Sequence, residues 1–197
     1  MKRRTFDALL ISLGLTMMLV LAAAGGLLTW AHTFISGQVR TQLSAQQIFF
    51  PAQGDPALAP SAIGPHLNQY AGQQLVTGQQ AEVYADHFIA VHLRGIGGGK
   101  TYSQLSAAAK AEPNNTVLAG QVETVFKGET LRGLLLNAYA FGKMGTIAGA
   151  AAVGAFIGAL LMLLLAGLGL LHLRRTAPDK ELFTPSGAHA PEPAAVA

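Results

Sequence analysis

The sequence from Glu129 to Arg175 reads ETLRGLLLNAYAFGKMGTIAGAAAVGAFIGALLMLLLAGLGLLHLRR. Its second part, Ile147–Leu171, is a run of 25 residues without a charged side chain. At about 1.5 Å per residue such a helix is roughly 37 Å long, which is enough to cross a hydrocarbon core of about 30 Å with some tilt. Lys143 precedes the run, and Arg174 and Arg175 follow it. We therefore predict a transmembrane helix over residues 147–171, entered from a helical stalk.

The composition of the whole chain also indicates a membrane protein. Of its 197 residues 51% are hydrophobic and only 12% are charged, and the mean hydropathy is +0.38. These values are too apolar for an ordinary soluble domain. Residues 8–30 form a second uncharged run that is long enough to span a bilayer. The expected fold class is an all-α membrane protein, with an N-terminal and a C-terminal transmembrane helix flanking an extracytoplasmic helical domain.

The positions of the basic residues predict the orientation. Six of them flank the two spans: Lys2, Arg3, Arg4, Arg174, Arg175 and Lys180. The positive-inside rule then places residues 1–7 and 172–197 in the cytoplasm, and residues 31–146 outside the cell membrane. The C-terminal segment is rich in alanine and proline, which predicts a disordered tail.

The first span has an alternative interpretation as a cleaved signal peptide. Lys2–Arg4 would be its basic region, and Ala22–Ala24 would supply a cleavage site. The apolar run continues past that site to Trp30, which favours a retained anchor. Either outcome leaves the middle of the chain outside.

Charge and cysteine content exclude several function classes. The pI of about 9.4 is typical of nucleic-acid-binding proteins, but the basic excess flanks the spans. Residues 31–146 carry seven Lys/Arg against six Asp/Glu, so we expect no nucleic-acid partner. The chain has no cysteine, which excludes disulfides and thiol chemistry.

Within the outer domain, apolar periodicity and capping residues predict helices only. After Trp30 the first helix is expected to continue as a stalk that Pro51 stops, and residues 51–65 are expected to form an extended loop. Further helices are predicted over residues 65–75, where Thr77–Gly78 would end the helix, and over 79–94, 101–111 and 116–127. Thr101 with Gln104 resembles a capping box, Asn114 or Asn115 is expected to cap the next helix, and Gly128 is expected to separate that helix from the stalk at Glu129.

The segment Gly97–Thr101 (GGGKT) resembles the end of a phosphate-binding P-loop. That motif requires a glycine five residues before the last glycine, where this chain has Arg94, and it requires a preceding strand where the pattern here predicts a helix. We interpret the segment as a turn between two helices, and we expect no cofactor.

Metal and catalytic sites are weakly supported. His87 and His92 are five residues apart, so they point in different directions on an α-helix, and Glu82 with Asp86 supplies only two carboxylates. Ser, His and Asp occur in the outer segment without a nucleophile motif such as G-x-S-x-G. The sequence therefore predicts neither catalytic nor metal-binding residues, and no enzymatic activity.

The second span carries small residues at four-residue spacing, which let helix backbones approach closely in lipid. The predicted helix-packing residues are Gly145, Gly149, Ala150, Gly154 and Gly158. Their partner would be the first span, through Gly14 or residues 22–26, or a second copy of the chain. Neither span has an ionisable residue in its centre, so a charged transport pathway has no candidate residues.

Four phrases carry a resemblance to a known family: QLSAQQIFFP (42–51), AEVYADHFIAVHL (81–93), GKTYSQ (99–104) and GETLRGLLLNAYAF (128–141). Over residues 5–175 the chain resembles small, uncharacterised actinobacterial membrane proteins with one span at each end. The resemblance implies a location and a topology but no activity. Some members are labelled aromatic ring-opening dioxygenases; that chemistry needs an iron site of His and carboxylate ligands, which this sequence does not show.

Three functions follow as hypotheses. The first is a non-enzymatic envelope scaffold or interaction protein, whose partners are the lipid bilayer and a protein of the membrane or envelope, or a second copy. The second is an extracytoplasmic small-ligand sensor or an accessory subunit of a membrane complex. The third is a metal-dependent enzyme, which requires distant residues to converge.

Overall fold

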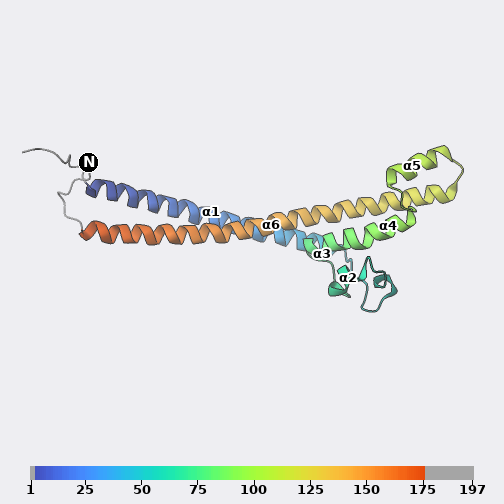
Figure 1. Cartoon of the computed structure of the whole chain (residues 1–197), viewed down its shortest axis with the longest axis horizontal. Coiled ribbons are helices and arrows are strands. Elements are labelled where there is room, and N and C mark those ends of the chain that lie inside the picture. Colours follow the sequence, from blue (N-terminus) through green and yellow to red (C-terminus); the bar gives the residue numbers. More distant parts are fainter. Residues whose placement is uncertain (1–2, 176–197) are drawn as a thin grey trace, which may run out of the picture. The chain divides into compact units, whose positions relative to one another are not determined.

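The computed structural model describes residues 3–175 (Figure 1). Met1, Lys2 and the predicted tail beyond Arg175 lie outside the described residues. The elements are α1 (Arg3–Ala45), η1 (Pro56–Leu58), α2 (Gly64–Leu67), η2 (Asn68–Tyr70), α3 (Gly78–Val83), η3 (Tyr84–Ile89), α4 (Ala90–Ile96), α5 (Tyr102–Ala111) and α6 (Thr116–Arg175). The described chain is thus all-helical, as predicted, and its only extended pairing is an isolated bridge between Phe49 and Gln74.

Two helices, α1 and α6, are long and apolar enough to cross a membrane. The chain divides into two compact units, of which the first comprises residues 1–27 and 152–197 and the second residues 28–151. Each unit has its own packing.

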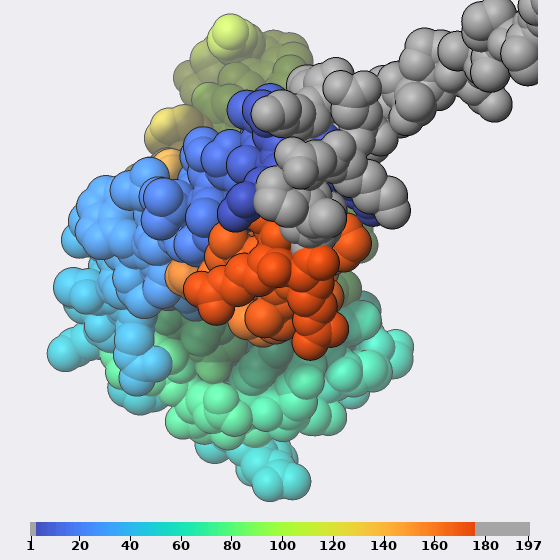
Figure 2. All heavy atoms as spheres, turned by 90° about the vertical axis from the view of Figure 1, so that its left-hand side faces the viewer, coloured from blue at the N-terminus to red at the C-terminus, as the bar shows by residue number. Residues whose placement is uncertain are grey.

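In the first unit, the start of α1 lies against the end of α6, blue beside orange in Figure 2. A Cβ added to Gly14 would lie 3.7 Å from the Cβ of Ala166, and the Gly25 backbone faces the ring of Phe156. In this unit the buried residues of the described part of α6 are Ala152, Ala159 and Ala166, which recur every seven residues. This is the repeat of a left-handed helix pair.

The second unit has a core of larger side chains. Its buried residues come from both long helices and from the segment between them: Leu43, Phe50, Leu58, Ile63, Leu67, Leu75, Ala81, Val83, Ala85, Ile89, Leu93 and Leu135. Full burial of such a side chain is worth about 1.5–3 kcal/mol. Both long helices contribute to this core, α1 through Leu43 and α6 through Leu135.

The predicted end of the first stalk at Pro51 is wrong, because α1 stops at Ala45. Gln47 adopts a positive φ of 53°, which turns the chain away from the helix axis. Residues after the turn then pair backbone to backbone, with Phe50 N–H donating to Gln73 O at 2.9 Å and Leu75 N–H donating to Ile48 O at 2.8 Å.

The predicted helix over residues 65–75 is also shorter than expected. It consists of α2 and η2, and the chain is extended around Gln74 because that residue pairs with Phe49. Thr77 does not end this helix; it begins the next one. Its hydroxyl accepts from Gln80 N–H in the capping box of α3.

The helix predicted over residues 79–94 exists as α3, η3 and α4, but η3 is a π-helix. A π-turn inserts extra residues into a helical run and changes the direction of the side chains that follow. Ala81 and Ala85 are buried, and Tyr84, Phe88 and Val91 pack against the core, so the apolar residues of this run face inward.

Gly128 was expected to separate two helices, and this expectation is wrong, because α6 runs unbroken from Thr116. Gly128 instead admits the side chain of Leu93, which occupies the space where a Cβ would lie. The glycine therefore serves helix packing, and the many helix-forming residues around it maintain the helix.

The two caps predicted beside α5 are confirmed. Thr101 and Gln104 form the capping box, and Asn115 Oδ1 accepts from Leu118 N–H at 3.0 Å at the start of α6. Leu105 of α5 and Val125 of α6 are buried. The helical hairpin formed by α5 and the start of α6 thus has a small apolar centre of its own.

Candidate functional site

The glycine-rich segment Gly97–Thr101 forms the turn between α4 and α5. Gly98 and Gly99 have φ values of 56° and 81°, which glycine adopts without strain. The turn borders a hollow of about 470 Å³ whose lining includes Arg94, Lys100, Glu129 and Arg132. The side chain and the backbone of Thr101 both bond Gln104, so this residue caps a helix.

Asp86 forms an ion pair that the sequence did not predict. Arg132 of α6 donates through Nη2 to Asp86 Oδ1 at 2.8 Å, and its Nη1 donates to Glu129 Oε2 at 3.2 Å. The hydrogen bond to Asp86 raises the pKa of the Arg132 guanidinium. About a third of each partner in the Arg132–Asp86 pair is exposed, so the pair positions η3 against α6 and contributes about 1 kcal/mol or less.

The two histidines considered for metal binding have separate partners. His87 stacks on His66 of α2, with ring centroids 3.5 Å apart and planes within 8°. His92 donates from Nδ1 to Phe88 O at 2.8 Å, which closes one helical turn. Within residues 3–175 no group of three or more His, Cys, Asp and Glu side chains is arranged to hold a metal ion.

The predicted packing residues of α6 differ in what they contact. In the second unit, Gly145 lies against Ile35 and Ser36, and Gly149 lies against the ring of His32. In the first unit, Gly158 lies near Leu21, whereas Gly154 has nothing within 4 Å of the space for a Cβ. Ala150 is exposed.

His32 supplies a directional contact between α1 and α6. A backbone carbonyl only accepts, so His32 Nδ1 donates to Gly145 O at 2.8 Å. A Cβ at Gly149 would lie 2.9 Å from the same Nδ1 atom. The two glycines therefore leave room for the ring of His32 beside the backbone of α6.

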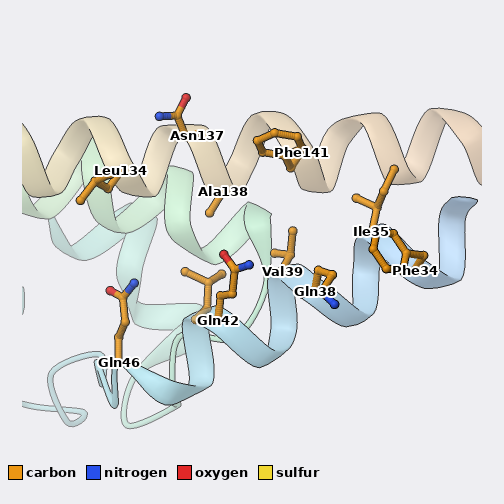
Figure 3. Close-up of a pocket in the computed structure, with 11 residues that line it drawn as sticks. Phe34, Ile35, Gln38, Val39, Gln42, Gln46, Leu134, Asn137, Ala138 and Phe141 are labelled. Carbon is orange, nitrogen blue, oxygen red and sulfur yellow. The ribbon is translucent and has the colours of Figure 1, made fainter.

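A groove in the second unit lies between residues 34–46 of α1 and residues 134–141 of α6 (Figure 3). Its volume is about 390 Å³. Its lining has an apolar part and an amide part, and no charged side chain belongs to it. The lining residues are Phe34, Ile35, Gln38, Val39, Gln42, Leu43, Gln46, Leu134, Asn137, Ala138 and Phe141.

Three apolar side chains that line this groove are more than half exposed. Phe34 is 53% exposed, Leu134 58% and Phe141 56%. Figure 3 shows Gln42 on the side of α1 that faces Ala138 of α6. Amide side chains both donate and accept hydrogen bonds, so the groove offers apolar contact with uncharged polar groups at its edge.

Sequence reasoning missed the groove, the Arg132–Asp86 pair and the His66–His87 stack. Asp86 and Arg132 are 46 residues apart, and Asp86 lies in the π-helix η3, so its direction does not follow from α-helical spacing. One signal for the groove was present: Gln38, Gln42 and Gln46 recur every four residues, which places three amides along one side of α1.

Comparison of the chain with protein-family models, curated proteins and solved structures finds no match. The resemblance to actinobacterial two-span proteins therefore remains a prediction from the quoted phrases.

Proposed function

We propose that the chain is a two-span protein of the cell membrane, with both termini in the cytoplasm, whose outer domain acts as a non-enzymatic interaction module. The uncharged groove between α1 and α6 carries this proposal. Phe34, Leu134 and Phe141 expose more than half of their surface beside it, although the same unit buries leucines such as Leu43 and Leu135 in its core. Clustered exposed apolar residues with a polar rim are typical of surfaces that bind a partner.

The groove suits an apolar segment of another protein of the membrane or envelope. An amphipathic helix laid into a groove places apolar residues along its floor and polar residues along its rim. Here Val39, Leu43 and Ala138 supply the floor, and the glutamines of α1 supply the rim. The absence of charge from the lining favours a partner face that is also uncharged.

The orientation is tested by cysteine labelling, for which the cysteine-free chain needs no background substitutions. We expect Ser103→Cys to react with a membrane-impermeant maleimide in intact cells, and Thr5→Cys to react only after lysis. Reaction of Thr5→Cys in intact cells would disprove the proposed topology.

The interaction role is tested by a photo-crosslinking residue at Gln42 in the full chain in its native membrane. We expect a discrete adduct that disappears when Leu134→Ser and Phe141→Ser are combined. The same crosslinker at Lys110 of α5 is the control position. An adduct of twice the chain's mass would identify a second copy as the partner, and an adduct that survives the double substitution would contradict the proposal.

A second candidate function is a small-ligand sensor or an accessory subunit that carries a ligand. The groove volume of about 390 Å³ favours it, because pockets for small molecules measure about 300–1,000 Å³. A thermal-shift screen of the full chain in neutral detergent separates the two functions. A ligand that stabilises the native chain but not the Leu134→Ser, Phe141→Ser chain would favour the sensor.

A further inference from the structure

A second hollow of the outer unit, distinct from the groove, has the chemistry of an anion site. Its volume is about 390 Å³, and it is bounded by α1, by the start of α3 and by α6. Two cations line it, Arg40 of α1 and Lys143 of α6, together with hydroxyl and amide groups. The lining residues are Ser36, Val39, Arg40, Val76, Thr77, Gly78, Gln79, Tyr139, Gly142, Lys143 and Thr146.

No carboxylate belongs to this lining. The nearest acid in the hydrogen-bond network is Glu82, whose Oε2 accepts from Gln79 Nε2 at 2.8 Å without lining the hollow. Arg40 and Lys143 form no ion pair with any residue of the described chain, unlike Lys127 and Arg132. Two cations from different helices thus face one space without a counter-charge in it.

Two of the hydroxyl groups around the cations are available as donors. Thr77 and Thr146 use their hydroxyl protons on Gln80 and on Gly142 O, whereas Ser36 and Tyr139 have no side-chain hydrogen bond among the described residues. Arginine, lysine and free hydroxyls supply only N–H and O–H donors to an oxyanion. A guanidinium binds phosphate oxygens in pairs, and an ammonium adds a compact charge.

The position of the hollow along the chain suggests the source of such an anion. Lys143 precedes the second predicted span by four residues, about 6 Å along a helix, and Ser36 follows the first by six, about 9 Å. The headgroup layer adds about 5–8 Å to each side of the hydrocarbon core. Arg40 lies farther out, and its long side chain is able to reach back toward this layer.

We propose that the hollow between Arg40 and Lys143 binds a phosphate group, supplied by the headgroup of an anionic membrane phospholipid. The phosphate chemistry rests on the hollow alone. Only its supply by lipid rests on the membrane insertion proposed above.

The test uses the full chain in neutral detergent and counts retained lipid by native mass spectrometry. The probes are dioleoylphosphatidylglycerol, dioleoylglycerol, which lacks the phosphate, and inorganic phosphate as competitor. The variant is Arg40→Gln with Lys143→Gln; the control is Arg94→Gln with Lys110→Gln, which removes the same charge elsewhere. Far-UV circular dichroism establishes that each variant keeps its helix content.

We expect phosphatidylglycerol to bind about 25- to 30-fold more weakly to the Arg40→Gln, Lys143→Gln chain, at about fivefold for each lost cation. The control should bind as the native chain does, and dioleoylglycerol should not be retained. Competition by millimolar inorganic phosphate would support the phosphate site with a soluble source. Equal binding of phosphatidylglycerol by the native and double-substituted chains, or equal loss in the control, would overturn the inference. Cysteine labelling reports membrane insertion separately, so the two proposals fail independently.

Discussion

The two units of this chain bury different kinds of side chain. In the first unit the buried residues are Ile11, Gly25, Ala152, Ala159 and Ala166; in the second they include Ile63, Leu67, Leu75 and Leu135, each exposed by 1% or less. Lipid tails are as apolar as leucine, so association of helices in a bilayer depends on close approach and not on removal of apolar surface from water. The first unit has the pattern expected for lipid, and the second has the pattern expected for water.

This comparison predicts that removing side-chain volume from the core of the second unit lowers the free energy of unfolding. It also predicts that adding side-chain volume lowers this free energy wherever a glycine lies close to another helix. Neighbouring residues on the same helix provide matched controls, because they share the local helix and differ in what they face.

The largest effect is expected from Leu135→Ala. Leu135 is 1% exposed and its neighbour Leu134 is 58% exposed. Leu135→Ala should lower the free energy of unfolding of the second unit by about 2–5 kcal/mol, and Leu134→Ala should change it by less than about 0.5 kcal/mol. Urea denaturation of the full chain in neutral micelles, followed by the near-ultraviolet signal of the tyrosines, measures both, because all four tyrosines lie in this unit. Equal losses would refute the water-driven core.

The sequence predicted those parts of the fold that depend on neighbours along the chain. The apolar length of α1 and α6, the capping box of Thr101 and Gln104, and the cap by Asn115 are all local, and they are present in the structure. Each follows from spacing and hydrogen-bonding capacity within one or two helical turns.

The missed features depend on contacts between distant segments. The helix predicted over residues 65–75 is shorter than expected because Phe50 and Ile48 pair with Gln73 and Leu75, and Leu75 enters the core. Glycine often ends a helix, which is why Gly128 was expected to do so, but in the structure it makes room for the side chain of Leu93 within α6. The groove forms between α1 and α6, which are far apart in the sequence. The spacing of the glutamines on α1 indicated one side of the groove, but no local pattern indicated that α6 would form the other side.

A gain of side-chain volume is also expected to be costly at Gly78, where α3 begins against the backbone of α6. A Cβ there would lie 3.0 Å from Ala138 O and 3.2 Å from Tyr139 Cα. Backbone atoms cannot rotate away, so Gly78→Ala should cost about 1–3 kcal/mol in the same urea experiment. Gly133→Ala, with nothing within 4 Å, should stabilise α6 by up to about 1 kcal/mol. A neutral Gly78→Ala would show that this contact is loose.

The same substitution should have a smaller effect in the first unit. A Cβ at Gly25 would lie 2.9 Å from the ring of Phe156, which is 46% exposed and so has room to turn. Gly25→Ala should therefore destabilise the helix pair by about 1 kcal/mol or less, and Gly26→Ala, which faces open space, should not. Titration of the full chain with sodium dodecyl sulfate, read by far-ultraviolet circular dichroism, compares the two. A larger loss of stability from Gly26→Ala than from Gly25→Ala would contradict the assignment of Gly25 to the face of α1 that contacts α6.

The smallest effect concerns pH and tests how far water is excluded around Tyr84. This residue packs edge-on against Phe50, with ring centroids 5.3 Å apart, and burial raises its pKa above the ordinary 10.0. The unfolded chain then loses the phenol proton at lower pH than the folded chain does. Its contribution to stability is therefore complete below pH 10 and declines as the pH rises through the raised pKa.

Tyr84→Phe removes this titration and keeps the ring. We expect the late-ionising component of the absorbance change at 295 nm to disappear in the variant, with unchanged far-ultraviolet circular dichroism at pH 7. The urea midpoint of the native chain should fall more steeply between pH 9 and 11 than that of Tyr84→Phe, because only the native chain has a phenol whose ionisation the folded state resists. Parallel midpoints would mean that water reaches this face of the core, and the contrast between the two units would then rest on the aliphatic residues around Leu135 alone.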